Sequence, residues 1–326
     1  MPRLASLVAV IFCLATVSLA EDRQAVTDPL QTDADFAIQG EYLGQTFDDY
    51  GYWSWTGLQV VALGQGEFQA MEYRGGLPGH GWDCQTRRAY AGKRLENRVN
   101  LISSTGSYVI ADCGAGEYTA TSCRAGTLSK VERQSATLGA RPPCGARVLF
   151  DGTSLSEFNK AKLTNDGLLM VGTETALDYG DFTLHMEFRT PYAPSARGQG
   201  RGNSGVYIQG RYELQILDSF GLEGQANECG GLYKTRAPDV NMCLPPLTWQ
   251  TYDIDFQAAR FCGSQKICPA RISAWHNGVT IHNHVEIPGP TGAGQPETPD
   301  PKPIKLQDHG NPVHFRNIWV IDRTNR

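Results

Sequence analysis

The stretch "RGNSGVYIQGRYELQILDSFG", residues 201–221, combines strand-forming apolar residues with polar side chains that a packing strand does not need. Its apolar members are typical of a strand that is buried against a second layer: Val206, Ile208, Leu214, Ile216 and Leu217. Glu213, Gln215 and Asp218 interrupt that run with two carboxylates and an amide. The stretch therefore predicts a strand of a packed sheet whose other face carries chemistry.

The spacing of these polar residues suggests a shared surface. On a regular strand Glu213 and Gln215 lie on one face, and Asp218 lies on the other unless a single bulge returns it. The spacing resembles the bulged catalytic strand of laminarinase-like retaining glycosidases, in which two carboxylates serve as nucleophile and acid/base. Here the middle residue is Gln and the last is Asp, which departs from that pattern. A solvent-facing polar side of the strand is the simpler alternative.

Period-two alternation recurs through the second half of the chain. In "DFTLHMEFRT", residues 181–190, every second residue is apolar, which predicts a half-buried strand. The same period returns at 252–256 and 272–281, where Asn277-Gly278 marks a tight hairpin turn. Many short strands and little helix predict two antiparallel sheets packed face to face as a jelly-roll-like sandwich. The proline-rich and glycine-rich segment 289–303 is predicted to be an ordered loop or lid.

The first half predicts a separate, smaller β-rich domain over residues 36–138, followed by a Pro/Gly linker and a second domain from residue 146 to 326. Alternation on both sides of Gly64-Gln-Gly66 indicates a hairpin there. The run "DYGYWSW", residues 49–55, is either a stacking platform for sugar rings or part of the core of this domain. The whole chain is thus predicted to be all-β.

The amino terminus has the order of a secretory signal: a basic start, an apolar run and small residues before Glu21. We expect residues 1–20 to be removed after Ala20, which places the protein in a secreted or periplasmic compartment; a permanent anchor is the alternative. No other apolar run is long enough to span a membrane. The net charge of −5 becomes −6 without Arg3, which argues against nucleic acid and anionic membranes as partners.

Cysteine usage agrees with export. Of nine cysteines Cys13 leaves with the signal, and eight remain as an even set. We expect Cys229 to pair with Cys243, and Cys262 with Cys268, because short loops close easily between adjacent strands. No Cys-x-x-Cys pair favours zinc.

Six motifs, in this order and spacing, resemble the 3-keto-disaccharide hydrolase domain family over residues 146–325: "LFDG" at 149–152, the stretch 201–221, "NECGGLY" at 227–233, "PPLTWQTYDIDF" at 245–256, "WHNGVTIHNHVEIPGPTG" at 275–292 and "IKLQDHGNPVHFRNIWV" at 304–320. The resemblance implies a concanavalin A-like jelly roll. It also implies an exported protein whose substrate is a carbohydrate, namely a glycoside oxidised to a ketone at C3.

That chemistry needs few groups. A C3 ketone acidifies the C2 proton, so a base can remove it and the enolate can expel the group at C1, after which water adds. The resemblance also implies one divalent metal ion, which would stabilise the enolate. We assign His309 as the base, because imidazole titrates near neutral pH, although a histidine in a turn is the alternative.

The other predicted site residues come from the matching motifs. Glu213 and Asp218 are predicted to be catalytic, and Glu228 is a candidate metal ligand or acid. The residues predicted to bind the sugar are Arg201, Asn203, Gln215, Gln307 and Arg316. His282 and His284 are a further candidate metal pair, or residues of a wet hairpin edge.

Three functions compete on this evidence. An enzyme that cleaves 3-keto-glycosides predicts that Glu213, Asp218 and His309 converge in one cleft. A retaining glycosidase needs Glu213 and Asp218 about 5–5.5 Å apart. A non-catalytic carbohydrate-binding or cell-envelope module predicts an open aromatic groove and scattered carboxylates.

Overall fold

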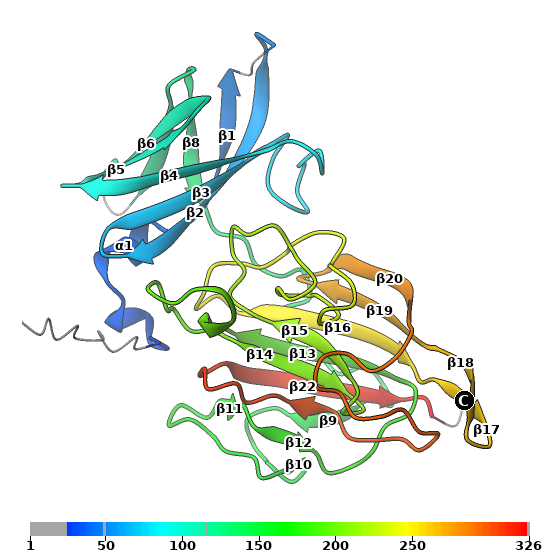
Figure 1. Cartoon of the computed structure of the whole chain (residues 1–326). Helices are drawn as coiled ribbons and strands as arrows, with labels where there is room; N and C mark the ends of the chain where they lie inside the picture. The colour runs from blue at the N-terminus through cyan, green and yellow to red at the C-terminus, as the bar shows by residue number, and fades with distance from the viewer. Residues whose placement is uncertain (1–24, 48–49, 115–116, 325–326) are drawn as a thin grey trace, which may run out of the picture.

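The computed structural model describes residues 25–47, 50–114 and 117–324, and the predicted signal at residues 1–20 lies outside them. The described chain is all-β, as predicted, with a barrel followed by a two-sheet sandwich (Figure 1). Helical turns among the described residues are limited to η1 (Pro29–Gln31), α1 (Ala34–Ile38) and η2 (Gly198–Gly200). None of these helices has the length and apolar character needed to cross a membrane.

The barrel is closed, because its strands pair in sequence order and the last returns to the first. Its interior is apolar and aromatic, with Tyr42, Phe68 and Tyr90 among the buried residues. The hairpin predicted around Gly64-Gln-Gly66 joins two of its strands. The strands are β1 (Gly40–Phe47), β2 (Trp53–Gly64), β3 (Glu67–Arg74), β4 (Arg87–Leu95), β5 (Arg98–Ser103), β6 (Gly106–Asp112), β7 (Tyr118–Ser122) and β8 (Gly126–Val131).

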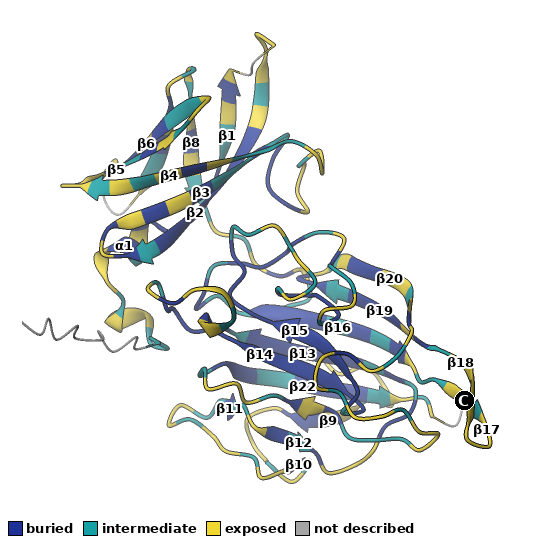
Figure 2. Ribbon diagram, in the orientation of Figure 1, coloured by how far each residue is buried: buried dark blue, intermediate teal, exposed yellow. Residues whose placement is uncertain are grey.

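The sandwich begins at residue 147 and packs two antiparallel sheets around one apolar core. A five-stranded sheet has the order β10-β12-β21-β14-β15. Its strands are β10 (Phe158–Asn159), β12 (Thr173–Thr175), β14 (Ser204–Ile208), β15 (Tyr212–Ile216) and β21 (Lys305–Leu306). Strands β14 and β15 are buried along their whole length, as Figure 2 shows.

The second sheet is seven-stranded, in the order β11-β22-β13-β16-β19-β20 with β9 paired to β22. The run 181–190 forms its strand β13 as predicted, with Phe182, Leu184, Met186 and Phe188 in the core. The strands are β9 (Arg147–Phe150), β11 (Leu169–Met170), β13 (Phe182–Arg189), β16 (Gln250–Gln257), β19 (Ala270–His276), β20 (Val279–Ile287) and β22 (His314–Asp322), and a separate ribbon joins β17 (Arg260–Cys262) to β18 (Gln265–Cys268).

Barrel and sandwich share a packed contact at β2. Val61 points outward from the barrel and is only 5% exposed, because it belongs to the core cluster of the sandwich. A Cβ at Gly221 would lie 2.5 Å from Val61 Cγ2, so the Gly221 backbone packs closely against the Val61 side chain. Beside it the Arg201 guanidinium donates to the Ala62 carbonyl at 3.4 Å. The barrel therefore contributes to the core of the second domain.

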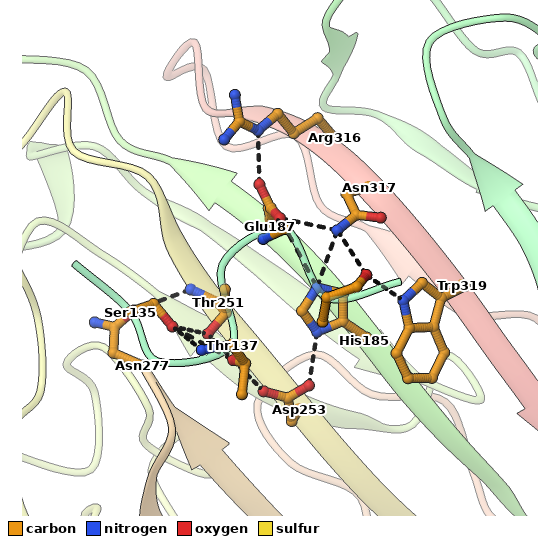
Figure 3. Close-up of polar contacts among 12 residues, drawn as sticks. Ser135, Thr137, His185, Glu187, Thr251, Asp253, Asn277, Arg316, Asn317 and Trp319 are labelled. Atoms are coloured by element: carbon orange, nitrogen blue, oxygen red, sulfur yellow. Dashed lines mark hydrogen bonds and ion pairs between the residues drawn. The ribbon is translucent and has the colours of Figure 1, made fainter. Parts of the chain in front are cut away.

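The segment between the domains is docked onto the outer face of the seven-stranded sheet (Figure 3). Thr137 Oγ1 donates to Asp253 Oδ2 at 2.6 Å, and the Gly139 N–H donates to Glu187 Oε1 at 2.7 Å. The Ala140 carbonyl accepts from the Asn317 amide and the Trp319 indole at 3.1 and 3.2 Å. A segment whose composition predicts a linker is thus held by partly buried polar contacts.

The eight described cysteines are free thiols in this structure. Cys229 and Cys243 are both buried, and their thiols lie within hydrogen-bonding reach of each other. Cys262, in contrast, lies opposite Gln265, and Cys268 lies opposite Arg260. Neither predicted pair is bonded here, and the register of the β17–β18 ribbon does not place Cys262 and Cys268 opposite each other.

Candidate active site

One side chain from each of four neighbouring strands forms a row across the outer face of the five-stranded sheet. Glu213 on β15 lies opposite Tyr207 on β14, and Tyr207 lies opposite Lys305 on β21. Lys305 in turn lies opposite Glu174 on β12. Their strand neighbours point the other way, into the core. The apolar partners of the opening stretch therefore fix the direction of its polar residues.

A cavity of about 360 Å³ lies over this face. It brings together Glu213, Gln215, Asn203, Gln307 and His309, all of them predicted from the sequence. The rest of the described lining comes from the loops around it and from β14: Gln199, Tyr207, Tyr233, Lys234, Gly292 and Ala293. Polar groups of one cavity thus come from segments separated by more than a hundred residues.

Glu213 is the carboxylate at the floor of the cavity. It is 2% exposed, and its Oε2 accepts from the Tyr207 hydroxyl at 2.7 Å. Burial raises the pKa of Glu213, although the Tyr207 hydrogen bond and the charges of His309 and Lys305 oppose the shift. Glu213 therefore holds its proton to a higher pH than an exposed glutamate, which suits a group that exchanges protons with a substrate.

Amide groups surround this carboxyl. With its amide nitrogen turned toward β14, Gln215 donates to Glu213 Oε1 at 3.0 Å and to the Ser204 carbonyl at 2.9 Å. Asn203 Nδ2 donates to the Gln199 carbonyl at 2.8 Å. Gln307 Oε1 is buried and has no protein partner among the described residues. An acceptor left unsatisfied at a cavity wall is suited to a hydroxyl of a ligand.

Two glycines let the backbone approach Glu213. A Cβ at Gly205 would lie 2.6 Å from Glu213 Oε1, and a Cβ at Gly292 would lie 3.1 Å from Glu213 Oε2 and 2.7 Å from Tyr233 Cδ1. Gly292 also has a φ of +51°, which disfavours other residues. The segment 289–303, predicted as a loop or lid, thus closes one side of the cavity at this glycine.

Asp218 and Arg201 do not reach the cavity. Strand β15 pairs with β14 without a bulge and ends at Ile216, so the predicted bulge is absent and Asp218 does not join Glu213. Instead Arg201 Nε donates to Asp218 Oδ2 at 2.6 Å in a buried ion pair below the barrel contact. The prediction that Asp218 converges with Glu213 and His309 was wrong.

Arg316 and Glu228 also lie elsewhere. Arg316 Nε donates to Glu187 Oε2 at 2.6 Å, and its guanidinium lies 4.0 Å from the centre of the Trp249 ring. Glu228 Oε2 accepts from the backbone N–H groups of Gly224 and Gln225 at 2.7 and 2.9 Å. Arg316, predicted to bind the sugar, thus forms a salt bridge with Glu187 outside the cavity, and Glu228 caps a turn.

The two histidines of β20 do not form a metal pair. A register shift between Ile272 and Ala274 puts His282 into the core while His284 is exposed. His282 Nε2 donates to the Gly230 carbonyl at 2.7 Å, and His282 Nδ1 accepts from Arg236 Nη1 at 2.6 Å. Burial lowers its pKa to about 4, so it stays neutral under ordinary conditions.

The donors in the cavity are a poor match to a divalent cation. Among the described residues that line the cavity, Glu213 supplies a carboxylate and His309 supplies an imidazole. The other polar groups are amides, hydroxyls and the ammonium of Lys234. No group of three or more His, Cys, Asp or Glu side chains suited to a metal occurs among the residues that the structure describes. The chemistry below is therefore argued from the side chains of this chain.

Tyr207 and Lys234 were not predicted from the sequence. Tyr207 stands two residues after Gly205 on β14, and only the pairing of β14 with β15 places its hydroxyl against Glu213. Lys234 follows the "NECGGLY" motif, and it carries a positive charge at the cavity. The period of two could have placed Tyr207 on the polar face, but nothing local reveals its partner.

Comparison with known proteins agrees with this architecture. Residues 145–321 match the 3-keto-alpha-glucoside-1,2-lyase-like domain family. A crystal structure of a candidate glycosyl hydrolase from Parabacteroides distasonis ATCC 8503 is similar at 32% identity and a TM-score of 0.51, covering 55% of this chain and 84% of that chain. Another candidate glycosyl hydrolase from that organism matches at 18% identity and a TM-score of 0.41, over 55% of this chain and 94% of that chain. No curated protein matched.

The family match spans more than half of the chain and coincides with the six motifs quoted above. The resemblance drawn from those motifs is thereby confirmed. The chain belongs to the 3-keto-alpha-glucoside-1,2-lyase-like domain family, a carbohydrate-active class of domain.

Proposed function

We propose that the protein is an exported enzyme that cleaves 3-keto-glycosides by elimination and hydration. The observation that carries the proposal is the 360 Å³ cavity that joins a buried carboxyl, an imidazole and several amides on one sheet face. Family membership supports the substrate class. Elimination needs a base, stabilisation of an enolate and an acid, and the cavity contains candidates for each.

In this proposal His309 removes the C2 proton of the bound sugar. It is exposed at the cavity and close enough to Glu213 for its charge to lower the pKa of that carboxyl. Asn203, Gln215 and Gln307 hydrogen-bond to the sugar hydroxyls. Lys234, which lines the same cavity, supplies the positive charge that stabilises the enolate oxygen. Glu213, whose pKa burial raises, is the source of the proton for the leaving oxygen.

The retaining-glycosidase alternative loses support from the geometry. That mechanism needs a second carboxylate about 5–5.5 Å from the first, across the glycosidic bond. Among the described residues that line the cavity, the carboxylate belongs to Glu213. Asp218 forms an ion pair with Arg201 outside the cavity. An elimination that forms no oxocarbenium ion does not need the missing nucleophile.

The test is an assay of the purified protein on methyl 3-keto-glucoside and its unoxidised parent, each with and without chelator. We expect release from the keto compound alone, and a loss of about 10²–10⁴-fold in kcat for His309→Ala. Loss of activity with chelator would show that the predicted divalent ion is also needed. Release from the parent sugar would instead favour the glycosidase.

A second function, which we propose for the barrel, is binding of a polysaccharide. Every exposed aromatic residue among the described residues lies in one short stretch: Phe47, Tyr50, Tyr52, Trp53 and Trp55, at 39, 71, 71, 57 and 52% exposure. Trp53 and Trp55 share the outer face of β2, and Phe47 lies opposite Trp53 with ring centres 5.8 Å apart. These rings are therefore not core, and their faces suit the apolar faces of sugar rings.

Retention on insoluble polysaccharides tests this second function. We expect the double variant Trp53→Ala/Trp55→Ala to lose retention while its kcat on methyl 3-keto-glucoside is kept. Ile102→Ala, which removes a 65% exposed side chain elsewhere on the barrel, is the control. Equal retention of both variants, or none for the unaltered protein, would remove this function from the barrel.

A further inference from the structure

A second cavity adjoins the first on the same sheet face. It measures about 270 Å³, and it shares Tyr207, Ala293 and Gln307 with the first cavity. Its other walls come from β12, β21 and the loops beside them: Glu174, Gln209, Gly210, Gln295, Lys302, Pro303, Lys305 and Asp308. The two hollows are thus parts of one groove that is divided at the shared residues.

The groove runs across the strands along the row of paired side chains. From Glu213 it passes Tyr207 and Lys305 and reaches Glu174. Neighbouring strands lie about 4.8 Å apart, so the row is about 14 Å long. A single sugar in the first cavity leaves the Glu174 end unfilled, and a substituent on that sugar could extend along the row.

Tyr207 stands at the division. It lines both cavities, and its hydroxyl donates to Glu213 Oε2 at 2.7 Å. The Lys305 ammonium lies 5.9 Å from the centre of its ring. A bond that joins a group in one cavity to a group in the other must pass this residue. Because the Tyr207 hydroxyl is hydrogen-bonded to the Glu213 carboxyl, Tyr207 can give a proton to such a bond and receive one from Glu213.

We propose that Tyr207 is a catalytic acid which protonates the leaving oxygen, with the sugar in the first cavity and the leaving group in the second. This inference rests on the proposed function. It adds Tyr207 to the catalytic residues and states which cavity holds each part of the substrate. Two lysines, Lys302 and Lys305, and two acidic residues, Glu174 and Asp308, line the second cavity, and Lys305 is the cross-strand partner of Glu174. Such a balanced polar lining suits a neutral, hydroxyl-bearing leaving group better than a charged or greasy one.

The proton and electron movements balance. His309 takes the C2 proton, and the C2–H electron pair enters the enolate. That pair then forms the C1–C2 double bond as the C1–O bond breaks, and the leaving oxygen keeps the C1–O pair. Tyr207 gives its proton to this oxygen and regains one from the Glu213 carboxyl. When water adds at C1, its proton restores Glu213 through Tyr207, and the His309 imidazolium returns a proton to C2.

The test compares two leaving groups in Tyr207→Phe. A 4-nitrophenyl 3-keto-glucoside has a leaving group that needs no acid, whereas the methyl 3-keto-glucoside has one that does. We expect kcat on the methyl compound to fall by about 10²-fold or more, and kcat on the nitrophenyl compound to change by less than about threefold. The ratio of the two rates is independent of the fraction of folded protein.

Tyr233→Phe is the matched control, because Tyr233 lines the first cavity and not the second. We expect it to change both rates by a similar factor. An equal loss on both substrates for Tyr207→Phe would overturn the proposal, since it would show a positioning role. So would unchanged rates on both. If the unaltered protein cleaves neither keto compound, the failure belongs to the proposed function and not to Tyr207.

The place of the leaving group has its own test. Lys302→Ala should raise KM for a 3-keto-disaccharide at least several-fold and leave KM for the methyl glycoside unaltered, because a methyl group does not reach Lys302. Equal effects on both substrates would overturn the assignment of the second cavity.

Discussion

Glu213 is a buried carboxyl at the floor of the cavity, and the burial that suits it to the proposed proton transfer also disfavours its charged form. The β14–β15 pairing holds it against Tyr207, and glycines at 205 and 292 bring the backbone close to both of its oxygens. Burial favours its protonated form, since a charge in the cavity wall loses hydration. Glu213 therefore lowers the free energy of unfolding at neutral pH, a cost that its proposed role would explain.

Glu213→Gln should be inactive and more stable. Because the pKa of Glu213 is raised in the folded protein, its favourable contribution is complete below the unfolded value of 4.5 and is lost as pH rises through the folded pKa. We expect the variant to lose about 10²–10⁴-fold in kcat on the methyl 3-keto-glucoside and to melt at a higher temperature at pH 7 than the unaltered protein. A melting temperature that falls at pH 7 would contradict this account.

Asp218→Ala should reduce stability and not the chemistry. It leaves the buried Arg201 guanidinium without its carboxylate, which typically costs about 3–5 kcal/mol of unfolding free energy. Urea unfolding measures the loss, and the double variant Arg201→Ala/Asp218→Ala should be less destabilised than the sum of the single changes. A stable Asp218→Ala protein that has lost kcat would restore Asp218 to the catalytic set.

Residues of the site differ in how far the sequence could predict them. Glu213, Gln215, Asn203, Gln307 and His309 lie in matching motifs and converge in the cavity. Arg201 and Asp218 lie in the same stretch, but the strand ends before Asp218, and the arginine that pairs with it comes from the preceding loop. A spacing rule cannot show where a strand stops or which partner a buried charge finds. The Tyr207 contact required the register of the sheet.

At the scale of elements, the period of two predicted the strands, and the docked linker was not foreseen. Its Pro/Gly composition is typical of a flexible connection, yet the outer face of β13, β16 and β22 presents His185, Glu187 and Asp253 to it (Figure 3). The period of two predicts them on the polar sides of half-buried strands, His185 and Glu187 on β13 and Asp253 on β16. The partners of the linker come from three strands, so no local pattern could reveal them.

His185 and Glu187, which lie under the docked linker, should make the free energy of unfolding fall at both low and high pH. Burial alone would lower the pKa of His185, but hydrogen bonds and charges of Asp253 and Glu187 outweigh it and raise the pKa. Burial would raise the pKa of Glu187, but hydrogen bonds from His185, Asn317, Arg316 and Gly139 lower it to about 2. The contribution of His185 to the free energy of unfolding is complete below its unfolded pKa of 6.5, and it is lost as pH rises through the pKa of the folded protein. The contribution of Glu187 to the free energy of unfolding is complete above its unfolded pKa of 4.5, and it is lost as pH falls toward its folded pKa of about 2.

Urea midpoints measured from pH 3 to 9 check this dependence. We expect a maximum from His185 and Glu187 between about 4.5 and 6.5, and a decline at higher pH that is reduced in His185→Gln. The exposed His80 provides the control variant His80→Gln, which should retain the decline. An unchanged high-pH limb in His185→Gln would show that another group causes it.

At the scale of the whole molecule, the barrel and the sandwich are joined by more than the chain. Val61 of β2 belongs to the core of the sandwich, and Ala62 supplies the carbonyl that Arg201 contacts. The last strand of the barrel ends at Val131, and the first strand of the sandwich begins at Arg147. The composition of the halves could not show that the contact between them is apolar and buried, because that property depends on which barrel face meets the sandwich.

Val61→Asp should uncouple the two halves in thermal unfolding. A charge buried among the apolar residues of the sandwich core is strongly unfavourable, so we expect the barrel contact to open. Calorimetry should then show a broader or split transition compared with the unaltered protein. Val109→Asp, on the exposed outer face of β6 at 37% exposure, should keep the original transition. Identical traces for both variants would contradict a coupled interface.

The row of side chains from Glu213 to Glu174 allows substrate specificity to evolve by single substitutions. Its four members occupy successive strands, and Glu174 and Lys305 lie far in the sequence from Tyr207 and Glu213, so each would meet a different portion of a bound substrate. Their side chains leave the ladder of backbone hydrogen bonds intact, because they point away from the core. An exchange at Lys305 or Glu174 can therefore alter what is recognised at one position while Tyr207 and Glu213 stay in place. Diversification in this domain can proceed one strand at a time.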